Sequence, residues 1–263
     1  MVEQGKLLAI DGLNIVRRVY EASPEPDSHE KAETALRHAL SSFRNLLAAH
    51  EPSHVLAAFD FGGPTWRHAL YPRYREQRAP MPSFLRAALP AFHDKLAQFG
   101  LRVVMLPDVE ADDVIGTGVL RWLSEGRGQA IIATTDKDLH GLIADGALVW
   151  DHFKGEWHDD AWVRNKFGVA PELLVDLLAL MGDVTDGVPG VSKVGMKTAA
   201  KLLNAYGNLD AVMAGAGILK TPIGERLRAE RDILMLSREL VRLKCDVRLG
   251  VTWKMLAYNQ DFH

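Results

Sequence analysis

Strand-length apolar runs alternate with amphipathic segments in the first half of the chain, and this alternation limits the folds open to it. The runs are rich in Val, Ile, Leu and Ala and cover residues 6–11, 53–60, 101–107 and 129–136. Between them, apolar residues at helical spacing occupy 31–49, 83–99 and 111–123. Continuous apolar runs are typical of strands covered on both faces. The alternation therefore predicts an α/β fold with a parallel sheet and right-handed crossovers.

Acidic residues follow every one of these runs. Asp11, Asp60 and Asp136 end three of them, and Glu110 follows the run at 101–107. The carboxyl ends of parallel strands lie at one edge of a sheet, where sites in such folds form. We therefore expect these side chains to converge there. Further acids in the adjoining turns are candidates for the same site: Asp112, Asp113, Asp138, Asp183 and Asp186.

A carboxylate-rich site of this kind predicts divalent cations. Without cations the carboxylates could not all stay ionised, because repulsion and desolvation would raise some of their pKa values. Oxygen ligands without sulfur suit Mg²⁺ or Mn²⁺, and two such ions roughly 3.5–4 Å apart would suit phosphodiester hydrolysis. Taken singly, a strand-end Asp is more often a helix cap, "EADD" a charged first helical turn, and "TDKD" a plain turn. Their convergence favours the metal site.

Composition narrows the class further. The one cysteine, Cys245, excludes an internal disulfide and a cysteine zinc cluster. The net charge of −3 argues against a nucleic-acid partner, but basic residues cluster at 66–78 and 193–201, and distribution decides binding. The sequence contains no P-loop, "GxSxG" elbow or dinucleotide fingerprint. No apolar run is long enough to span a bilayer, and we expect a cytoplasmic protein without a membrane partner.

The second part of the chain predicts mainly helices. The helical patterns cover 170–182, 195–205 and 224–243, and Gly-rich turns lie between the first two. We expect two domains, an α/β core over 1–168 and a helical region over 169–263.

Five motifs of the chain resemble, in order and spacing, those of the 5′-nuclease family, which includes the 5′→3′ exonuclease domain of bacterial DNA polymerase I and flap endonucleases. The motifs are "AIDGLN", "AAFDFGGPTWRHALYPRYREQRAPMP", "VEADDVIG", "TTDKDL" and "MGDVTDGVPGVSKVGMKTAAKLL". The resemblance implies a PIN-like parallel-sheet nuclease core and a C-terminal DNA clamp containing a helix–hairpin–helix. With no polymerase region in the sequence, we expect a free-standing member.

The resemblance also assigns roles to individual acids. A first metal site would use Asp11, Asp60, Glu110 and Asp112, with Asp113 adjoining. A second would use Asp136, Asp138, Asp183 and Asp186. Some free-standing relatives have lost the last two acids, and their presence in "MGDVTDG" favours an active nuclease.

Basic and aromatic residues are assigned in the same way. "WRHALYPRYREQRAP" matches the stretch leading into a helical arch for a 5′ single strand, with Arg75 and Arg78 at basic catalytic positions and Tyr74 stacking on a base. Arg75 stands where the family often has Lys, and a planar guanidinium is not equivalent to a compact ammonium, so we expect the rate rather than the reaction to differ. The helix–hairpin–helix often holds K⁺. The implied DNA contacts are Arg67, Gly190, Val191, Ser192, Lys193, Val194, Gly195, Lys197 and Lys201. Alone, these stretches also suit a solvated basic loop and a plain Gly-rich connection.

Together these features predict a structure-selective, divalent-metal-dependent 5′→3′ exonuclease and flap endonuclease. Its substrate would be DNA with a free 5′ end, as a flap, nick or overhang, with RNA-primed DNA a further candidate, and we expect a monomer. Two alternatives stay open at this point. One is a junction-binding protein with weak or no catalysis, against which Asp183 and Asp186 count. The other is an RNA-directed nuclease on a related fold, against which the duplex-clamp turn at 187–195 counts.

Overall fold

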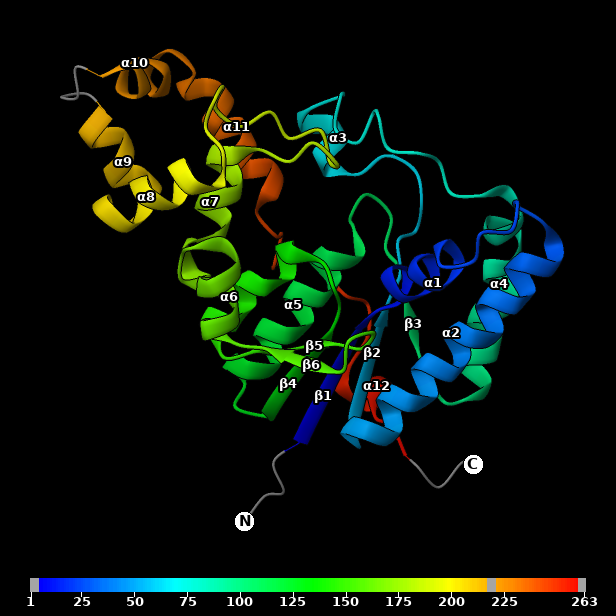
Figure 1. The fold of residues 1–263 in the computed structure, drawn as a ribbon. Helices are drawn as coiled ribbons and strands as arrows, with labels where there is room; N and C mark the ends of the chain where they lie inside the picture. The colour runs from blue at the N-terminus through cyan, green and yellow to red at the C-terminus, as the bar shows by residue number, and fades with distance from the viewer. Residues whose placement is uncertain (1–4, 217–220, 260–263) are drawn as a thin grey trace.

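A six-stranded sheet forms the centre of the larger part of the molecule (Figure 1). The computed structural model describes residues 5–216 and 221–259, so the outer ends of the expected domain ranges, 1–4 and 260–263, lie outside the described residues. The strands are β1 (Gly5–Asp11), β2 (His54–Ala58), β3 (Val103–Val104), β4 (Gly128–Ala133), β5 (Leu148–Asp151) and β6 (Glu156–His158). Their order is β3-β2-β1-β4-β5-β6, and only β6 pairs antiparallel with its neighbour.

Helices connect the strands and build the second part of the chain. In the first part they are α1 (Gly12–Glu21), α2 (His29–His50), α3 (Trp66–Leu70), α4 (Ser83–Gln98), α5 (Ala111–Ser124) and the 3₁₀ segment η1 (Lys137–Asp145). In the second part they are α6 (Asp160–Phe167), η2 (Pro171–Leu173), α7 (Leu174–Met181), α8 (Met196–Tyr206), α9 (Leu209–Ala216), α10 (Pro222–Ala229), α11 (Arg231–Val241) and α12 (Trp253–Leu256). None of these described helices combines the length and apolarity needed to cross a bilayer.

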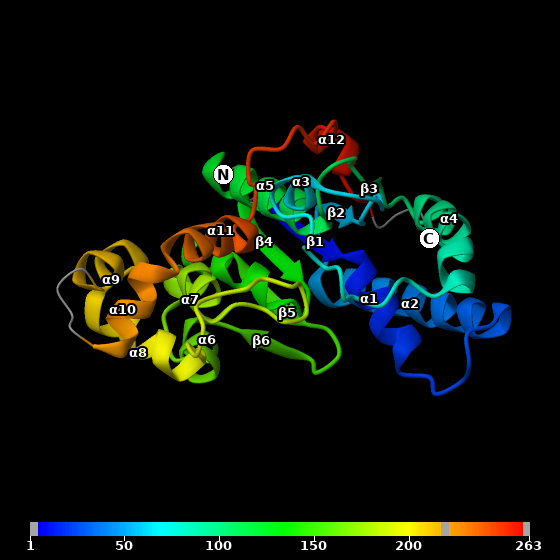
Figure 2. The ribbon, with the colours of Figure 1, turned by 90° about the horizontal axis from the view of Figure 1, so that it is seen from above.

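Both faces of the sheet are covered, as the continuous apolar runs predict. Along β1, Leu8 and Ile10 pack with α1, α2 and α4, whereas Leu7 and Ala9 pack with α5 on the other face. Figure 2 shows the two layers on either side of the strands. A third apolar cluster holds α6 to α11 together and lies beside the sheet (Figure 1).

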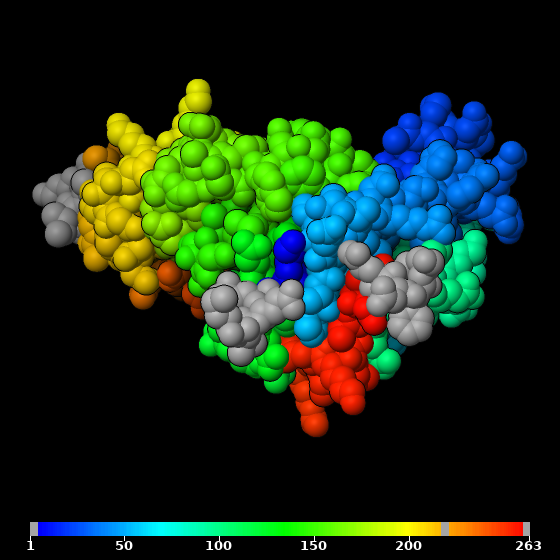
Figure 3. All heavy atoms as spheres, turned by 90° about the horizontal axis from the view of Figure 1, so that it is seen from below, coloured from blue at the N-terminus to red at the C-terminus, as the bar shows by residue number. Residues whose placement is uncertain are grey.

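The chain reverses its order across the sheet between β1 and β4, which are neighbours at its centre. After β1 the chain continues into α1 on one face of the sheet, and after β4 it continues into η1 on the other face. In α/β sheets, sites form at the carboxyl ends of strands where the connections part in this way. The opposite end of the sheet is covered by the C-terminal segment: Tyr258 donates its backbone N–H to the Ser53 carbonyl at 2.8 Å. Seen from below, this red segment lies against light blue atoms, which separate it from the dark blue amino end of β1 (Figure 3). The carboxyl end of β1 is therefore the end available for a site.

Several elements differ from the sequence expectations. The run at 101–107 forms only the two-residue β3, and the strands β5 and β6 lie outside the predicted runs. The single helix expected over 224–243 is divided at Glu230, whose backbone leaves helical geometry (φ −105°, ψ 21°). The Glu230 carboxylate accepts hydrogen bonds from the N–H and hydroxyl of Ser192. A tertiary contact, which helical periodicity does not encode, accompanies the break.

Candidate metal centre

Four aspartates line one cleft, of about 710 Å³, beyond the carboxyl ends of the central strands. They are Asp11, Asp60, Asp112 and Asp136. Asp11 ends β1, Asp60 follows β2, Asp136 follows β4, and Asp112 lies in the first turn of α5. The structure therefore brings together residues that are up to 125 positions apart, at the switch point of the sheet.

Local donors fix the orientation of these carboxylates. Asp11 accepts hydrogen bonds from the Asn14 N–H at 3.1 Å and from the Thr134 hydroxyl at 2.9 Å. Asp60 accepts from the Ala111 N–H at 2.8 Å, which ties the end of β2 to the start of α5. Asp136 caps η1 by accepting from the Asp138 N–H at 3.1 Å. Asp11 and Asp136 thus cap a helix and line the cleft at the same time.

The electrostatics of the cleft are those of crowded, buried carboxylates. Burial, and after it the charge of Asp136, raises the pKa of Asp11 to about 7. Burial and the charge of Asp136 also raise the pKa of Asp112 well above its usual value. Asp138 behaves in the same way, with a pKa of about 7. The carboxylates repel one another, so ionising all of them requires added positive charge.

A second acidic group adjoins the first and is paired with cations of the protein itself. The Lys137 ammonium contacts Asp183 and lies 3.7 Å from Asp138 Oδ1. That Asp138 oxygen is buried and has no hydrogen-bond partner within the described residues. Asp186 forms a bidentate pair with the Arg75 guanidinium at 3.0 and 3.1 Å. Burial opposes ionisation of Asp186, but the charges of Arg75 and Arg78 hold its pKa below the usual value.

A close backbone approach holds the Asp183–Asp186 turn in place. Gly182 (φ 72°) and Gly190 (φ 62°) lie back to back, and a Cβ on Gly190 would lie 2.4 Å from the Gly182 nitrogen. Asp183 and Val188 exchange two backbone hydrogen bonds at 2.9 and 2.8 Å inside this turn. Only glycine fits both positions, which explains the spacing in "GDVTDGVPG".

Comparison with known proteins places this geometry in a family. The model of the N-terminal resolvase-like domain of 5′-3′ exonucleases matches residues 6–168, and that of their C-terminal SAM fold matches residues 169–262. The chain belongs to the 5′-3′ exonuclease family. This membership confirms the expected family and nuclease class, and with it the α/β core followed by a helical region.

Individual relatives of this exonuclease-family chain cover nearly its whole length. The flap endonuclease Xni of Shewanella amazonensis is 35% identical over 254 residues, which cover 97% of this chain and 98% of that protein. The flap endonuclease Xni of Aeromonas hydrophila is 36% identical over 261 residues, 96% of this chain and 95% of that protein. Among solved structures, T5 5′-exonuclease with bound divalent metal ions (zinc) has the same fold, with a TM-score of 0.73, 19% identity and coverage of 91% and 90%.

Two of the predicted site residues in this family member form a buried ion pair instead. Asp113 has no exposed surface, and its carboxylate pairs bidentately with the Arg67 guanidinium at 2.9 Å for both contacts. Asp113 also accepts from the Trp66 indole and the Lys244 N–H. In this structure neither side chain lines the cleft, and the roles of Asp113 as an adjoining metal ligand and of Arg67 as a DNA contact stay predictions.

Tyr74 and Glu110 are also enclosed. Tyr74 is 3% exposed and donates its hydroxyl hydrogen to Glu110 at 3.3 Å, and its stacking on a base stays a prediction. Glu110 is held by Arg67 at 3.2 Å and Arg75 at 3.1 Å, and it caps α5. Of the predicted basic residues, Arg75 and Arg78 do line the cleft.

In the predicted helix–hairpin–helix turn the lysine side chains are exposed, whereas several backbone N–H groups already donate hydrogen bonds within the protein. The N–H groups of Gly190, Val191 and Ser192 donate to Ser237, to the Leu180 carbonyl and to Glu230. Val194 donates to Val191, and Val191 and Val194 are buried. Lys193, Lys197 and Lys201 are exposed, as is Gly195 at the N-cap of α8. These N–H groups therefore already have partners within the protein. The phosphate contacts of Gly190, Val191, Ser192 and Val194 stay predictions, as do those of the lysines and Gly195.

Sequence reasoning missed Lys137, Thr134 and Glu230. Lys137 lies inside the "TDKD" motif, where a base between two acids is a signal for an internal counter-charge. Thr134 lies two residues before Asp136, and its hydroxyl accepts from the Asp136 N–H at 3.0 Å. Glu230 had no local signal, because its partner Ser192 is 38 positions away.

Proposed function

We propose that this protein is a structure-selective nuclease that hydrolyses DNA phosphodiesters near a junction of single and double strands, acting as a flap endonuclease and 5′→3′ exonuclease. The observation that carries the proposal is the convergence of Asp11, Asp60, Asp112 and Asp136 in one cleft. The names of the full-length relatives support the flap substrate. Unlike a junction-binding protein, a nuclease requires such a concentration of unneutralised acids, and this favours catalysis over the alternative.

The acids fit divalent cations on structural grounds. The donors are all oxygens, the pKa values of Asp11 and Asp138 are raised by burial and repulsion, and Asp138 Oδ1 is buried without a hydrogen bond. Mg²⁺ or Mn²⁺ suits such a set. As predicted from the sequence, one ion would be held by Asp11, Asp60, Glu110 and Asp112, and a second by Asp136, Asp138, Asp183 and Asp186. When bound, such ions activate water and stabilise charge on the phosphate oxygens.

The cleft's own cations would bind and orient the substrate. Arg75 and Arg78 line the cleft, and guanidinium groups bind phosphate bidentately. Arg75 bridges Glu110 and Asp186, so an incoming phosphate would share that guanidinium with two carboxylates. The segment from Arg75 into α4 is the candidate arch for a free 5′ end. K⁺ binding at the hairpin, cleavage of RNA-primed DNA, a monomeric state and a cytoplasmic location stay predictions from the sequence.

A flap assay tests this proposal. We expect a 5′-labelled DNA flap to give short products with Mg²⁺ and none with EDTA, and a bulky block on the 5′ end to slow cleavage. An RNA flap of the same sequence tests the RNA-directed alternative, which requires the RNA flap to be cleaved faster than the DNA flap. Tight junction binding with no cleavage under Mg²⁺ or Mn²⁺ would instead support the junction-binding alternative.

Mg²⁺ should stabilise the protein more strongly as pH rises from about 5 to about 8. Asp11 and Asp138 have folded-state pKa values raised from 3.8 to about 7. In the metal-free protein their contribution to stability is complete below the unfolded pKa and is lost as pH rises through about 7. Mg²⁺ binds the ionised forms, so the gap in Tm between Mg²⁺ and EDTA samples should widen with pH.

Thermal melts in paired buffers measure that gap. Groups that lie far from the cleft titrate equally in both buffers and cancel in the difference. A gap that stays constant or narrows with pH would show that these carboxylates do not bind the ion.

Removal of Lys197 and Lys201 together should weaken duplex binding and reduce its salt dependence. Both side chains are exposed on one helix, and the slope of log K against log salt should fall by about 1 for each phosphate that is no longer bound. The measurement is fluorescence anisotropy with a duplex over a range of salt. The control is Lys95→Ala at an exposed position of α4, and an equal slope for Lys197→Ala/Lys201→Ala and wild type would remove α8 from the interface.

A further inference from the structure

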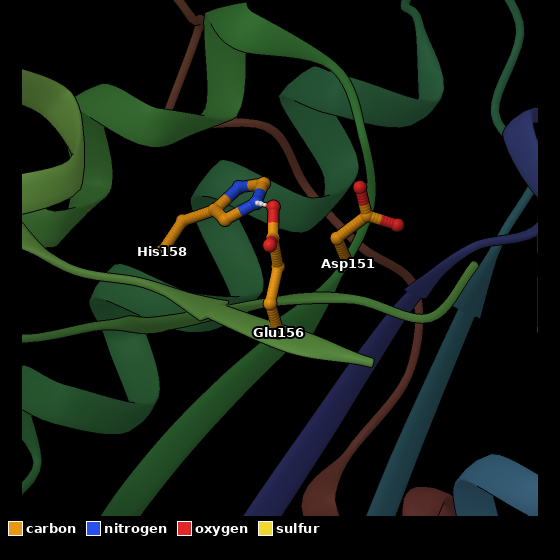
Figure 4. A group of neighbouring side chains, drawn as sticks. All are labelled: Asp151, Glu156 and His158. Atoms are coloured by element: carbon orange, nitrogen blue, oxygen red, sulfur yellow. Dashed lines mark hydrogen bonds and ion pairs between the residues drawn. The ribbon is translucent and has the colours of Figure 1, made fainter. Parts of the chain in front are cut away.

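Asp151, Glu156 and His158 form a cluster at the β5–β6 hairpin, and none of them lines the nuclease cleft (Figure 4). One ligand atom from each lies within 4.8 Å of the others. Asp151 and Glu156 are direct partners across the antiparallel pair, and His158 lies two residues along the same strand. Like charges directly opposite each other destabilise a hairpin, so this pair of acids favours a cation between them.

A chain of hydrogen-bond contacts behind the cluster runs through the His140 and His158 rings, and it is one proton short. His140 Nδ1 lies 2.7 Å from the Asp136 carbonyl, His140 Nε2 lies 2.8 Å from His158 Nδ1, and His158 Nε2 lies 3.1 Å from Glu156 Oε1. Both ends of this chain are oxygen acceptors. Its three contacts therefore need three protons, whereas two neutral imidazoles carry two. If His140 and His158 each donate toward Asp136, the bare Nε2 lone pair of His158 faces the Glu156 carboxylate.

Either a third proton or a metal ion can complete this chain, and the surroundings favour the metal. Both rings are buried and stacked on Trp162, which leaves little room for water to solvate an added charge on either ring. A proton would involve only His158 and Glu156. A metal ion would also use Asp151, whose Oδ1 accepts from two backbone N–H groups while Oδ2 has no hydrogen-bond partner among the described residues.

We propose that Asp151, Glu156 and His158 bind one borderline transition-metal ion, of the class of Zn²⁺ or Co²⁺, at a site separate from the oxygen-only acids of the cleft. One imidazole nitrogen and two carboxylate oxygens are a ligand set typical of Zn²⁺. The His140 ring would orient His158 from behind, as outer partners of metal-binding histidines do, and would connect the site to the Asp136 backbone. The Lys154 ammonium, 3.3 Å from Glu156 and largely exposed, would be displaced. This inference does not depend on the nuclease proposal.

Zn²⁺ titration of the full chain in excess Mg²⁺ tests the site, because excess Mg²⁺ competes with Zn²⁺ for the oxygen-only acids of the cleft and the readout is taken at His158 itself. The variant is Glu156→Gln, whose amide can donate the missing hydrogen to His158 Nε2, so the fold should be retained. We expect Zn²⁺ to shift the ¹⁵Nε2 resonance of His158 in the wild type, and Glu156→Gln to weaken that binding by roughly 100-fold or more. The matched control is Glu33→Gln, which alters an exposed His29–Glu33 pair 3.7 Å apart without a third ligand.

Two outcomes would overturn the site. One is equal Zn²⁺ affinity of the wild type and Glu156→Gln. The other is a ¹⁵N spectrum in which His140 or His158 is doubly protonated at neutral pH and unchanged by Zn²⁺, since a proton would then complete the chain. If Glu156→Gln does not fold, the Zn²⁺ affinity of Lys154→Ala is compared with that of the wild type. This variant removes the ammonium that competes for Glu156, so Zn²⁺ should bind more tightly. An unchanged affinity would count against the site.

Discussion

The Asp136→Ala protein should bind a DNA flap but cleave it on the order of 10²–10³-fold more slowly, or not at all. Asp136 is the neighbour whose charge most raises the pKa values of Asp11, Asp112 and Asp138, so it is the electrostatic centre of the acids. Loss of one such ligand removes several kcal/mol of metal-based transition-state stabilisation, and about 1.4 kcal/mol corresponds to tenfold in rate. Single-turnover cleavage and anisotropy binding measure the two effects separately.

A companion variant, Asp136→Asn, separates the effect of the Asp136 charge from the effect of its hydrogen bond at the N-cap of η1. The amide oxygen still accepts the Asp138 N–H, but the charge that repels the other acids is lost. We expect Asp136→Asn to be as inactive as Asp136→Ala, yet more stable than wild type in EDTA at neutral pH. Asp159→Asn changes a matched N-cap at α6, outside the cleft, and should leave cleavage unchanged. Undiminished cleavage by Asp136→Ala would refute the assignment of these acids.

The positions of Asp11, Asp60 and Asp136 could be predicted from sequence because each follows a buried strand directly. Strand direction and side-chain period fix where such residues lie once the sheet is parallel. The short β5–β6 hairpin could not be predicted in the same way, since its strands cover four and three residues. The bend at Glu230 depends on Ser192, a contact that local periodicity does not report.

Asp112 and Asp113 show where sequence proximity misleads. They are neighbours in the first turn of α5, where successive side chains point about 100° apart. Asp112 lines the cleft, whereas Asp113 points into the protein and meets Arg67, 46 positions earlier. A motif such as "EADD" predicts that acids lie near the end of the sheet. Which of them faces the cleft and which is buried in the core is decided by how the helix is oriented against the core.

Arg67→Met should lower the free energy of unfolding by about 3–5 kcal/mol, because it leaves the Asp113 charge buried and uncompensated. The Arg67 guanidinium is 3% exposed and also donates to the backbone carbonyls of Leu240 and Arg242, at 2.8 and 3.1 Å. It therefore holds the end of α11 against α3 and α5. Urea denaturation measures the loss. Arg121→Met is the control, since its exposed pair with Glu125 should contribute about 0–1 kcal/mol.

The double variant Arg67→Met/Asp113→Asn decides between a structural and a DNA-binding role for Arg67. The asparagine introduced in that protein keeps one amide oxygen, which can accept from either Trp66 or Lys244, and carries no buried charge, so part of the stability should return. DNA affinity of the folded double variant should equal that of wild type, because the guanidinium is enclosed by protein. A loss of DNA affinity without a loss of stability would instead restore Arg67 to the DNA interface, and the buried pair would then have to open when DNA binds.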